Sequence, residues 1–132
     1  MTHGDIEAVM RDFKRGFARV DRASLARAVT DDFEWHLHWF DGADEQPAGR
    51  VLRGLDEVIA EIERRRDRWS ELRYDDVEER FTEDLVVQTF VVSGVDGNGR
   101  RFHNAAVDLY PIRDGLIARK QTYWKQPHRA TD

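Results

Sequence analysis

Three side chains in this sequence could move protons: two histidines in one short segment and an aspartate nearer the C-terminus. His36 and His38 stand two residues apart in the aromatic-rich segment from Phe33 to Phe40. An imidazole changes charge near neutral pH, so either histidine could act as a base. Asp108 lies in the run Val107-Asp108-Leu109-Tyr110, and apolar surroundings penalise the charged form of a carboxylate. The sequence therefore predicts general acid–base chemistry by His36, His38 and Asp108.

Each of these residues also has a structural interpretation. A partly buried histidine can simply hydrogen-bond a backbone carbonyl, and His103 could face either a pocket or a dimer partner. Asp108 could instead form an ion pair at the surface or at an interface. A two-residue hairpin loop would place it opposite Gln121, and a three-residue loop with a bulge would place it opposite Lys120. Opposite Lys120 it would be an anion, and the acid role would fail.

A substrate would be contacted by polar and aromatic residues around these groups. The side chains of Gln88, Asn104 and Thr122 could hydrogen-bond a substrate carbonyl. Four tryptophans cannot all be fully buried in so small a domain, so we expect one or two to line a pocket. The expected substrate-binding residues are Phe13, Phe17, Trp35, Trp39, Gln88, Asn104, Thr122 and Trp124.

Other kinds of site find little support in the sequence. His36 and His38 could ligate a metal, but no third ligand follows at a suitable spacing, and the chain has no cysteine. There is no phosphate-binding loop, nucleophile elbow or zinc signature. The arginines between positions 64 and 68 are interpreted as a solvated helix face. We therefore expect neither a metal nor a cofactor.

Length and charge narrow the class of protein. A chain of 132 residues fits one domain, covering positions 1–132. The net charge of −5 argues against a nucleic-acid partner, which needs a basic surface. No segment approaches the length of a membrane span, and the first residues contain no signal-like apolar run. These features lead us to expect a cytoplasmic protein without a membrane or nucleic-acid partner.

The hydrophobic pattern predicts the elements that must position these groups. Apolar residues recur at helical spacing over 5–20, over 21–29 and after Gly54. Extended segments are predicted over 33–40, 72–81 and 85–93, with turns over 82–84 and 96–99, a loop over 41–53 and a frayed tail over 126–132. The stretch from Arg101 to Lys125 contains Asp114-Gly115 between two strand-like runs, which is a strong hairpin signal. Helices that precede a mainly antiparallel sheet indicate an α+β domain, with a pocket between the two layers.

Three motifs carry a resemblance to a known superfamily. They are Asp31-Asp32-Phe33-Glu34-Trp35-His36, the run Gly49…Arg53-Gly54…Glu57-Val58, and Arg113-Asp114-Gly115-Leu116-Ile117. The chain resembles the nuclear transport factor 2-like superfamily, and within it the SnoaL-like and ketosteroid isomerase-like proteins, from about Ile6 to Lys125. This resemblance implies a cystatin-like cone of three helices on a curved, mainly antiparallel sheet. It also implies a pocket for a small hydrophobic molecule, no obligatory cofactor and a homodimer through the sheet.

The resemblance identifies a fold rather than one activity, because this fold hosts isomerases, polyketide cyclases, dehydratases, hydrolases and binding modules. Asp108 matches the carboxylic acid that stabilises an enolate in ketosteroid isomerases. Phe13 and Leu37 stand where that family has its tyrosine and its base, and Thr122 where limonene epoxide hydrolase and several SnoaL-like cyclases have an aspartate. Two functions stay open. One is a cofactor-independent enzyme for proton transfer on a small hydrophobic carbonyl-containing molecule, and the other is a non-catalytic ligand-binding or dimerisation module.

Overall fold

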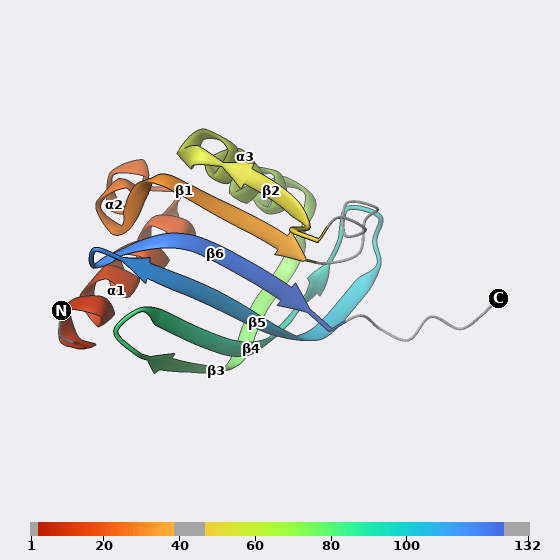
Figure 1. The fold of residues 1–132 in the computed structure, drawn as a ribbon. Coiled ribbons are helices and arrows are strands. Elements are labelled where there is room, and N and C mark those ends of the chain that lie inside the picture. The colour runs from red at the N-terminus through yellow and green to blue at the C-terminus, as the bar shows by residue number, and fades with distance from the viewer. Residues whose placement is uncertain (1–2, 39–46, 126–132) are drawn as a thin grey trace.

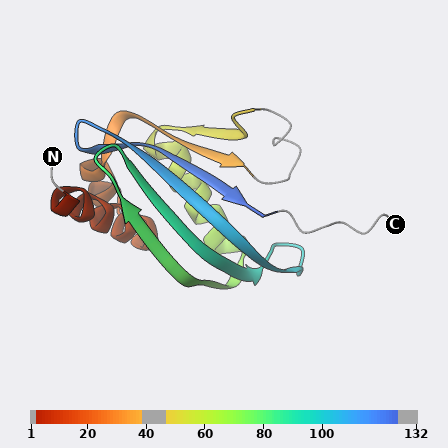
Figure 2. The ribbon, with the colours of Figure 1, turned by 60° about the horizontal axis from the view of Figure 1, so that its bottom comes forward.

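The computed structural model describes residues 3–38 and 47–125, which form three helices and six strands. All three helices lie on one face of a single sheet, and the other face is open (Figure 1). Figure 2, turned by 60°, shows the twist of the long strands and the same two layers. The elements in chain order are α1 (His3–Arg19), α2 (Arg22–Ala28), β1 (Val29–His38), β2 (Arg50–Arg53), α3 (Gly54–Arg68), β3 (Ser70–Phe81), β4 (Leu85–Val95), β5 (Arg101–Arg113) and β6 (Leu116–Trp124).

The sheet has the strand order β2-β1-β6-β5-β4-β3. Neighbouring strands are antiparallel except for β1 and β6, which run parallel side by side in the middle of the sheet. The architecture is therefore α+β, as predicted, with a mixed but mainly antiparallel sheet. None of the helices within the described ranges is long and apolar enough to cross a membrane.

The helices and β1 follow the apolar pattern of the sequence. Ile6, Met10 and Phe13 of α1 lie one turn apart on one stripe and are fully buried. In β1, Trp35 and Leu37 point into the core, while the side chains between them point to the opposite face. One face of β1 therefore packs against the helices, and the other faces away from them.

The predicted hairpin around Asp114-Gly115 is confirmed. Both residues have positive φ angles, 53° and 79°, and Arg113 pairs with Leu116 across the loop. Two consecutive positive φ angles are those of the two-residue turn that suits the twist of antiparallel strands. The hairpin thus sets β5 and β6 side by side, and together these strands carry most of the polar residues described below.

Several element boundaries differ from the prediction, and at two of them the type of element changes. Residues 50–53, expected to belong to a loop, form β2, which pairs with β1 at the edge of the sheet. A strand of four residues is too short for its alternation to be recognised in the sequence. Val29, expected at the end of a helix, begins β1, because a β-branched residue favours extended backbone. Trp39, Phe40 and the tail over 126–132 lie outside the described residues.

Candidate functional site

A cavity of about 270 Å³ lies between the helices and the inner face of the sheet. Its wall is rich in aromatic rings and also contains several polar side chains, which is a usual composition of a small-molecule site. The aromatic wall contains Phe13, Phe17, Trp35, Phe90, Tyr110 and Trp124. The polar lining includes Arg65, Gln88, Asp108, Lys120 and Thr122.

An irregularity in β6 decides which polar side chains of that strand face the cavity. Near the loop Ile112 pairs with Ile117, whereas farther along Asp108 pairs with Thr122. Between these two pairs β5 spans four residue steps, from 108 to 112, whereas β6 spans five, from 117 to 122. The strand β6 therefore contains one extra residue, a bulge, between the pairs. Ile117, Lys120 and Thr122 are consequently all buried. Neither of the two registers predicted for Asp108 is found, because a bulge in β6 accompanies the two-residue loop.

Asp108 is the centre of a buried hydrogen-bond chain. The indole of Trp35 donates from Nε1 to Thr122 Oγ1 at 2.9 Å, and Thr122 donates to Asp108 Oδ1 at 2.6 Å. An indole N–H can only donate, so Thr122 Oγ1 accepts from Trp35, and its own hydroxyl proton is left for Asp108. Tyr110 donates to Asp108 Oδ2 at 3.2 Å. Burial and the adjacent Asp108 raise the pKa of Tyr110 well above its usual value, which keeps its hydroxyl protonated.

This arrangement changes the role expected for Asp108. Asp108 contacts two hydroxyl groups, those of Thr122 and Tyr110, and both contacts lie inside the protein. The Nζ atom of Lys120 lies 3.7 Å from Asp108 Oδ2. The geometry therefore suits Asp108 as a residue that holds its neighbours in place.

Lys120 is buried among aromatic rings. Its Nζ lies 3.8 Å from the ring centre of Phe17 and 4.7 Å from that of Trp35. Burial lowers the pKa of Lys120 to about 8; the Asp108 charge raises it, and the Arg65 charge lowers it further. The faces of aromatic rings attract an ammonium group, but they replace its hydration only in part. The amine therefore gains and loses protons close to neutral pH.

Arg65 also borders the cavity, contrary to the expectation that the arginines over 64–68 form a solvated face. Val58, Ile62 and Arg65 recur at helical spacing, so Arg65 falls on the buried stripe of α3. Its guanidinium carbon lies 4.7 Å from the Trp35 ring and 4.8 Å from the Trp69 ring. Its Nε donates to Glu61 Oε2 at 2.9 Å. A second buried cation is thus held beside the cavity and compensated by its own carboxylate.

The two histidines of β1 lie on the outer face of the sheet and do not line the cavity. The prediction that they share one face is confirmed, but the same alternation that buries Trp35 turns them away from Asp108. Nε2 of His36 is 2.9 Å from Oε1 of Glu34. The ring of His38 stacks on Tyr123 at 4.2 Å between centroids, and burial together with the charge of His36 lowers the pKa of His38. The expectation that a histidine acts in the same pocket as Asp108 is therefore corrected.

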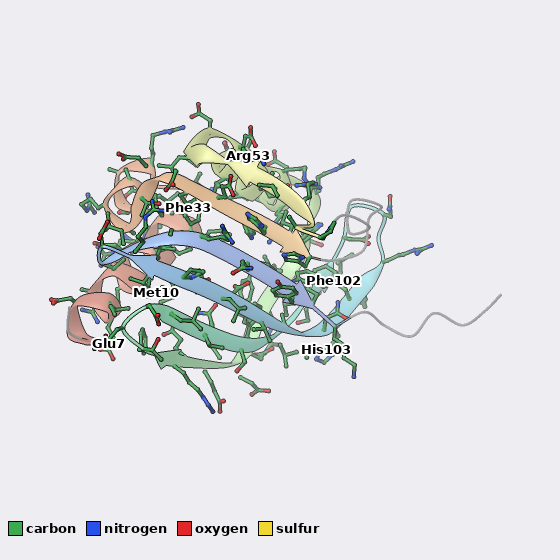
Figure 3. The ribbon with its side chains drawn as sticks, in the orientation of Figure 1. Glu7, Met10, Phe33, Arg53, Phe102 and His103 are labelled. Atoms are coloured by element: carbon green, nitrogen blue, oxygen red, sulfur yellow. The ribbon has the colours of Figure 1, made fainter. Side chains whose placement is uncertain are left out.

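His103 is exposed and pairs with Ser93 across β4 and β5. Figure 3 labels Glu7 and Met10 on α1, and His103 lies towards the opposite end of the sheet. Within residues 3–38 and 47–125, no three acidic or histidine side chains are grouped so that they could hold a metal ion.

Most of the predicted substrate-binding residues do lie around the cavity. The six that line it are Phe13, Phe17, Trp35, Gln88, Thr122 and Trp124. Asn104 lies farther along β5 and is not part of the lining, and Trp39 is outside the described residues.

The sequence prediction missed several polar residues of the wall, among them Lys120, Tyr110 and Arg65. One signal could have pointed to Lys120. The sequence contains only three lysines, Lys14, Lys120 and Lys125, against eighteen arginines. A lysine in the middle of a strand of such an arginine-rich chain is a candidate for a specific role, because the two side chains are not interchangeable.

Comparisons with known proteins agree with this architecture. The family model described as a SnoaL-like domain matches residues 10–120. No curated protein sequence matches the chain significantly. Among solved structures, an NTF2-like protein from Burkholderia xenovorans superimposes with a TM-score of 0.80 at 18% identity, over 95% of this chain and 92% of that one.

Two further structures are similar. A proposed polyketide cyclase from Xanthomonas campestris has a TM-score of 0.69 at 17% identity, over 93% of this chain and 92% of its own. A protein with a ketosteroid isomerase-like fold from Catenulispora acidiphila has a TM-score of 0.65 at 15% identity, over 87% and 83% of the two chains. Similarity at this level of identity concerns the fold. Since the family model covers most of the sequence, the chain belongs to the SnoaL-like domain family, and its fold is that of the NTF2-like structures.

Proposed function

We propose that this protein is a cofactor-independent enzyme that transfers protons next to the carbonyl group of a small hydrophobic molecule. The reaction would be of the isomerase, cyclase or dehydratase type. The observation that carries this proposal is the Lys120–Asp108 pair, buried in the wall of an otherwise aromatic cavity. Titratable groups placed in this way in a cavity are characteristic of functional sites.

Lys120 is the group proposed to exchange protons with the substrate. With a pKa of about 8 it is mainly an ammonium ion at neutral pH, yet a usable fraction is the free amine. As ammonium it would stabilise the negative charge that develops on a carbonyl oxygen during enolisation, and this effect is large where water is excluded. As free amine it would accept the proton from the neighbouring carbon.

Asp108 would act as a positioning residue in this scheme. Its carboxylate is held by the hydrogen bond from Thr122, which is itself held by Trp35. A carboxylate fixed in this way compensates the charge of Lys120 and keeps the amine on one side of the cavity. The aromatic wall formed by Phe13, Phe17 and Trp124 would bind the apolar part of the substrate.

The size of the cavity limits the substrate. At about 270 Å³ it lies near the lower end of the range for small-molecule sites, roughly 300–1,000 Å³. This volume favours a molecule with one or two rings or a short acyl chain. The proposed polyketide cyclase among the similar structures supports the class of chemistry, because polyketides are carbonyl-rich, and it does not indicate the substrate.

The proposal can be tested by hydrogen exchange at carbon. We would incubate the protein in D2O with small ketones such as acetophenone and cyclohexenone, and follow deuterium uptake next to the carbonyl by mass spectrometry. Lys120→Met should lower the exchange rate by about 100-fold or more, the usual contribution of general acid–base catalysis. Lys125→Met and His36→Asn are matched controls, since neither residue lines the cavity, and both variants should keep the wild-type rate.

A second candidate function is binding without catalysis. The outward position of His36 and His38 favours it, because the cavity then lacks the imidazole base that the sequence suggested. A ketone that quenches tryptophan fluorescence on binding, but exchanges no faster than in buffer, would support the binding module and refute the enzyme.

We also propose that two copies associate through the outer face of the sheet. The alternation that turns Asp108 inward places Val107 and Leu109 on the outer face of β5, beside Val87 and Val91 of β4. These four half-buried side chains form an apolar surface on the side of the sheet that carries no helix. An apolar surface of this kind is typical of an interface between subunits.

A further inference from the structure

We propose that Lys120 forms a covalent imine with aldehydes and unhindered ketones that enter the cavity. This inference rests on the site of the proposed function, and it specifies both the way in which the amine acts and the class of carbonyl compound that it accepts. General proton transfer would require only that the amine lie near the substrate. Imine formation requires in addition that a neutral amine nitrogen can reach the carbonyl carbon.

The surroundings of Nζ meet this requirement. The side chain of Lys120 is 8% exposed, lines the cavity, and has aromatic ring faces on several sides, which offer no oxygen as hydrogen-bond acceptor. Its carboxylate neighbour Asp108 is 3.7 Å away, beyond the usual length of a charged hydrogen bond. The amine is thus close enough to be oriented by Asp108, but it is not engaged so tightly that a ligand carbonyl could not replace that contact.

The protonation state supports the same inference. Burial lowers the pKa of Lys120 to about 8, so a far larger fraction is neutral at pH 7 than for an ordinary lysine with a pKa near 10.4. The charge of Arg65 acts in the same direction. Desolvation in a hydrophobic pocket, together with a neighbouring cation, is a recognised way to activate a lysine as nucleophile.

The steps balance with one proton taken from the solvent and no other reactant. The neutral amine of Lys120 attacks the carbonyl carbon, a C–N bond forms, and the carbonyl oxygen becomes a hydroxyl group by taking up that proton. The nitrogen then loses a proton to Asp108, and that proton leaves with the hydroxyl group as water. The product is a protonated imine whose positive charge lies beside the Asp108 carboxylate. Such a cation acidifies the adjacent C–H bonds, so within the imine Lys120 would assist proton transfer by withdrawing electrons and would not itself be the base.

The other two lysines provide internal controls. Lys14 lies at the edge of the cavity, but its side chain is 44% exposed and its Nζ contacts Glu79 Oε1 at 2.8 Å. Lys125 is exposed at the end of β6 and does not line the cavity. Because the sequence has no other lysine, each site can be assigned to a separate peptide after digestion.

The test traps the imine by reduction. We would treat the intact protein at pH 7 with benzaldehyde and sodium cyanoborohydride, and measure the benzyl group on each lysine over time by peptide mass spectrometry. Lys120 should be benzylated at least about tenfold faster than Lys14 and Lys125, because its neutral fraction is larger. Benzyl alcohol, which fills the cavity without a carbonyl, should slow labelling at Lys120 alone. In Lys120→Arg, labelling at the other two lysines should be unchanged.

Labelling of Lys120 at the same rate as Lys125, or no labelling of Lys120, would overturn the inference. The exchange assay separates this failure from failure of the proposed function. If deuterium exchange depends on Lys120 but no benzyl group is trapped on it, the proton-transfer function is retained and the imine is rejected. If a benzyl group is trapped on Lys120 but the protein does not speed up deuterium exchange, the imine is supported and proton transfer is rejected as the reaction.

Discussion

Replacement of Lys120 should change the way in which the free energy of unfolding depends on pH. In the folded protein the pKa of Lys120 is about 8, whereas a lysine in the unfolded chain has a pKa near 10.4. Because Lys120 is buried, the surrounding water weakens this pKa difference only a little. The difference in pKa corresponds to a free-energy penalty of roughly 3 kcal/mol on the charged form of Lys120 in the folded protein.

The sign of this pH dependence follows from whether the folded or the unfolded state binds the proton at the higher pH. Above pH 10.4 the Lys120 amine is neutral in both states, so its burial carries no penalty for desolvating a charge. As the pH falls from 10.4 to 8, the unfolded chain takes up a proton before the folded protein does, so stability is lost. Below pH 8 the loss is complete. Between pH 10 and pH 7 Lys120 alone should therefore lower the free energy of unfolding by roughly 2 to 3 kcal/mol.

The assay is urea denaturation followed by tryptophan fluorescence at pH 7 and at pH 10, for the wild type, Lys120→Met and Lys120→Arg. Neither substitute titrates in this interval, so both variants should lose the pH-dependent difference attributed to Lys120. Tyr110, whose raised pKa reduces stability above pH 10, is present in all three proteins and largely cancels in the comparison. If both variants show the same pH dependence as the wild type within about 0.5 kcal/mol, the reasoning about the buried amine is refuted.

Two further predictions concern the hydrogen-bond chain and the assembly. Thr122→Val removes the acceptor of the Trp35 indole and a donor to Asp108, and should lower the free energy of unfolding in urea by about 2 to 4 kcal/mol. Thr122→Ser keeps the hydroxyl group and should lower it clearly less, and equal effects of the two substitutions would contradict the importance of the chain. Leu109→Glu on the outer face should convert a two-chain particle into a single chain, as measured by light scattering, and a wild-type protein that already has the mass of one chain, 15.5 kDa, would refute the proposed dimer.

Local patterns in the sequence predicted most of the fold. The stripe of Ile6, Met10 and Phe13 predicted α1 and its buried face, and alternation in β1 predicted the inward position of Trp35. Asp114-Gly115 predicted the turn between β5 and β6. Each of these signals depends on residues next to one another in the chain, because the helical repeat, the strand repeat and the positive φ of a turn are local properties.

The polar part of the site was predicted less well. Arg65 was assigned to a solvated face because a run of arginines is usually exposed, although its spacing from Val58 and Ile62 placed it on the buried stripe. The histidines were assigned to the pocket because of their chemistry, although the alternation of β1 already separated them from Trp35. In both cases the position of the residue in the repeat, and not its type, decides where the side chain lies.

By itself the sequence determined which segments become helices and strands, which faces are apolar, and where the last hairpin turns. The tertiary structure alone decided that β1 lies parallel to β6, that an extra residue in β6 places Asp108 opposite Thr122, and that Lys120 shares the cavity with Arg65. Trp35 and Thr122 are hydrogen-bonded although 87 positions separate them in the chain. Contacts of this kind depend on strand register and on packing between layers, and neither is written in a repeat of neighbouring residues.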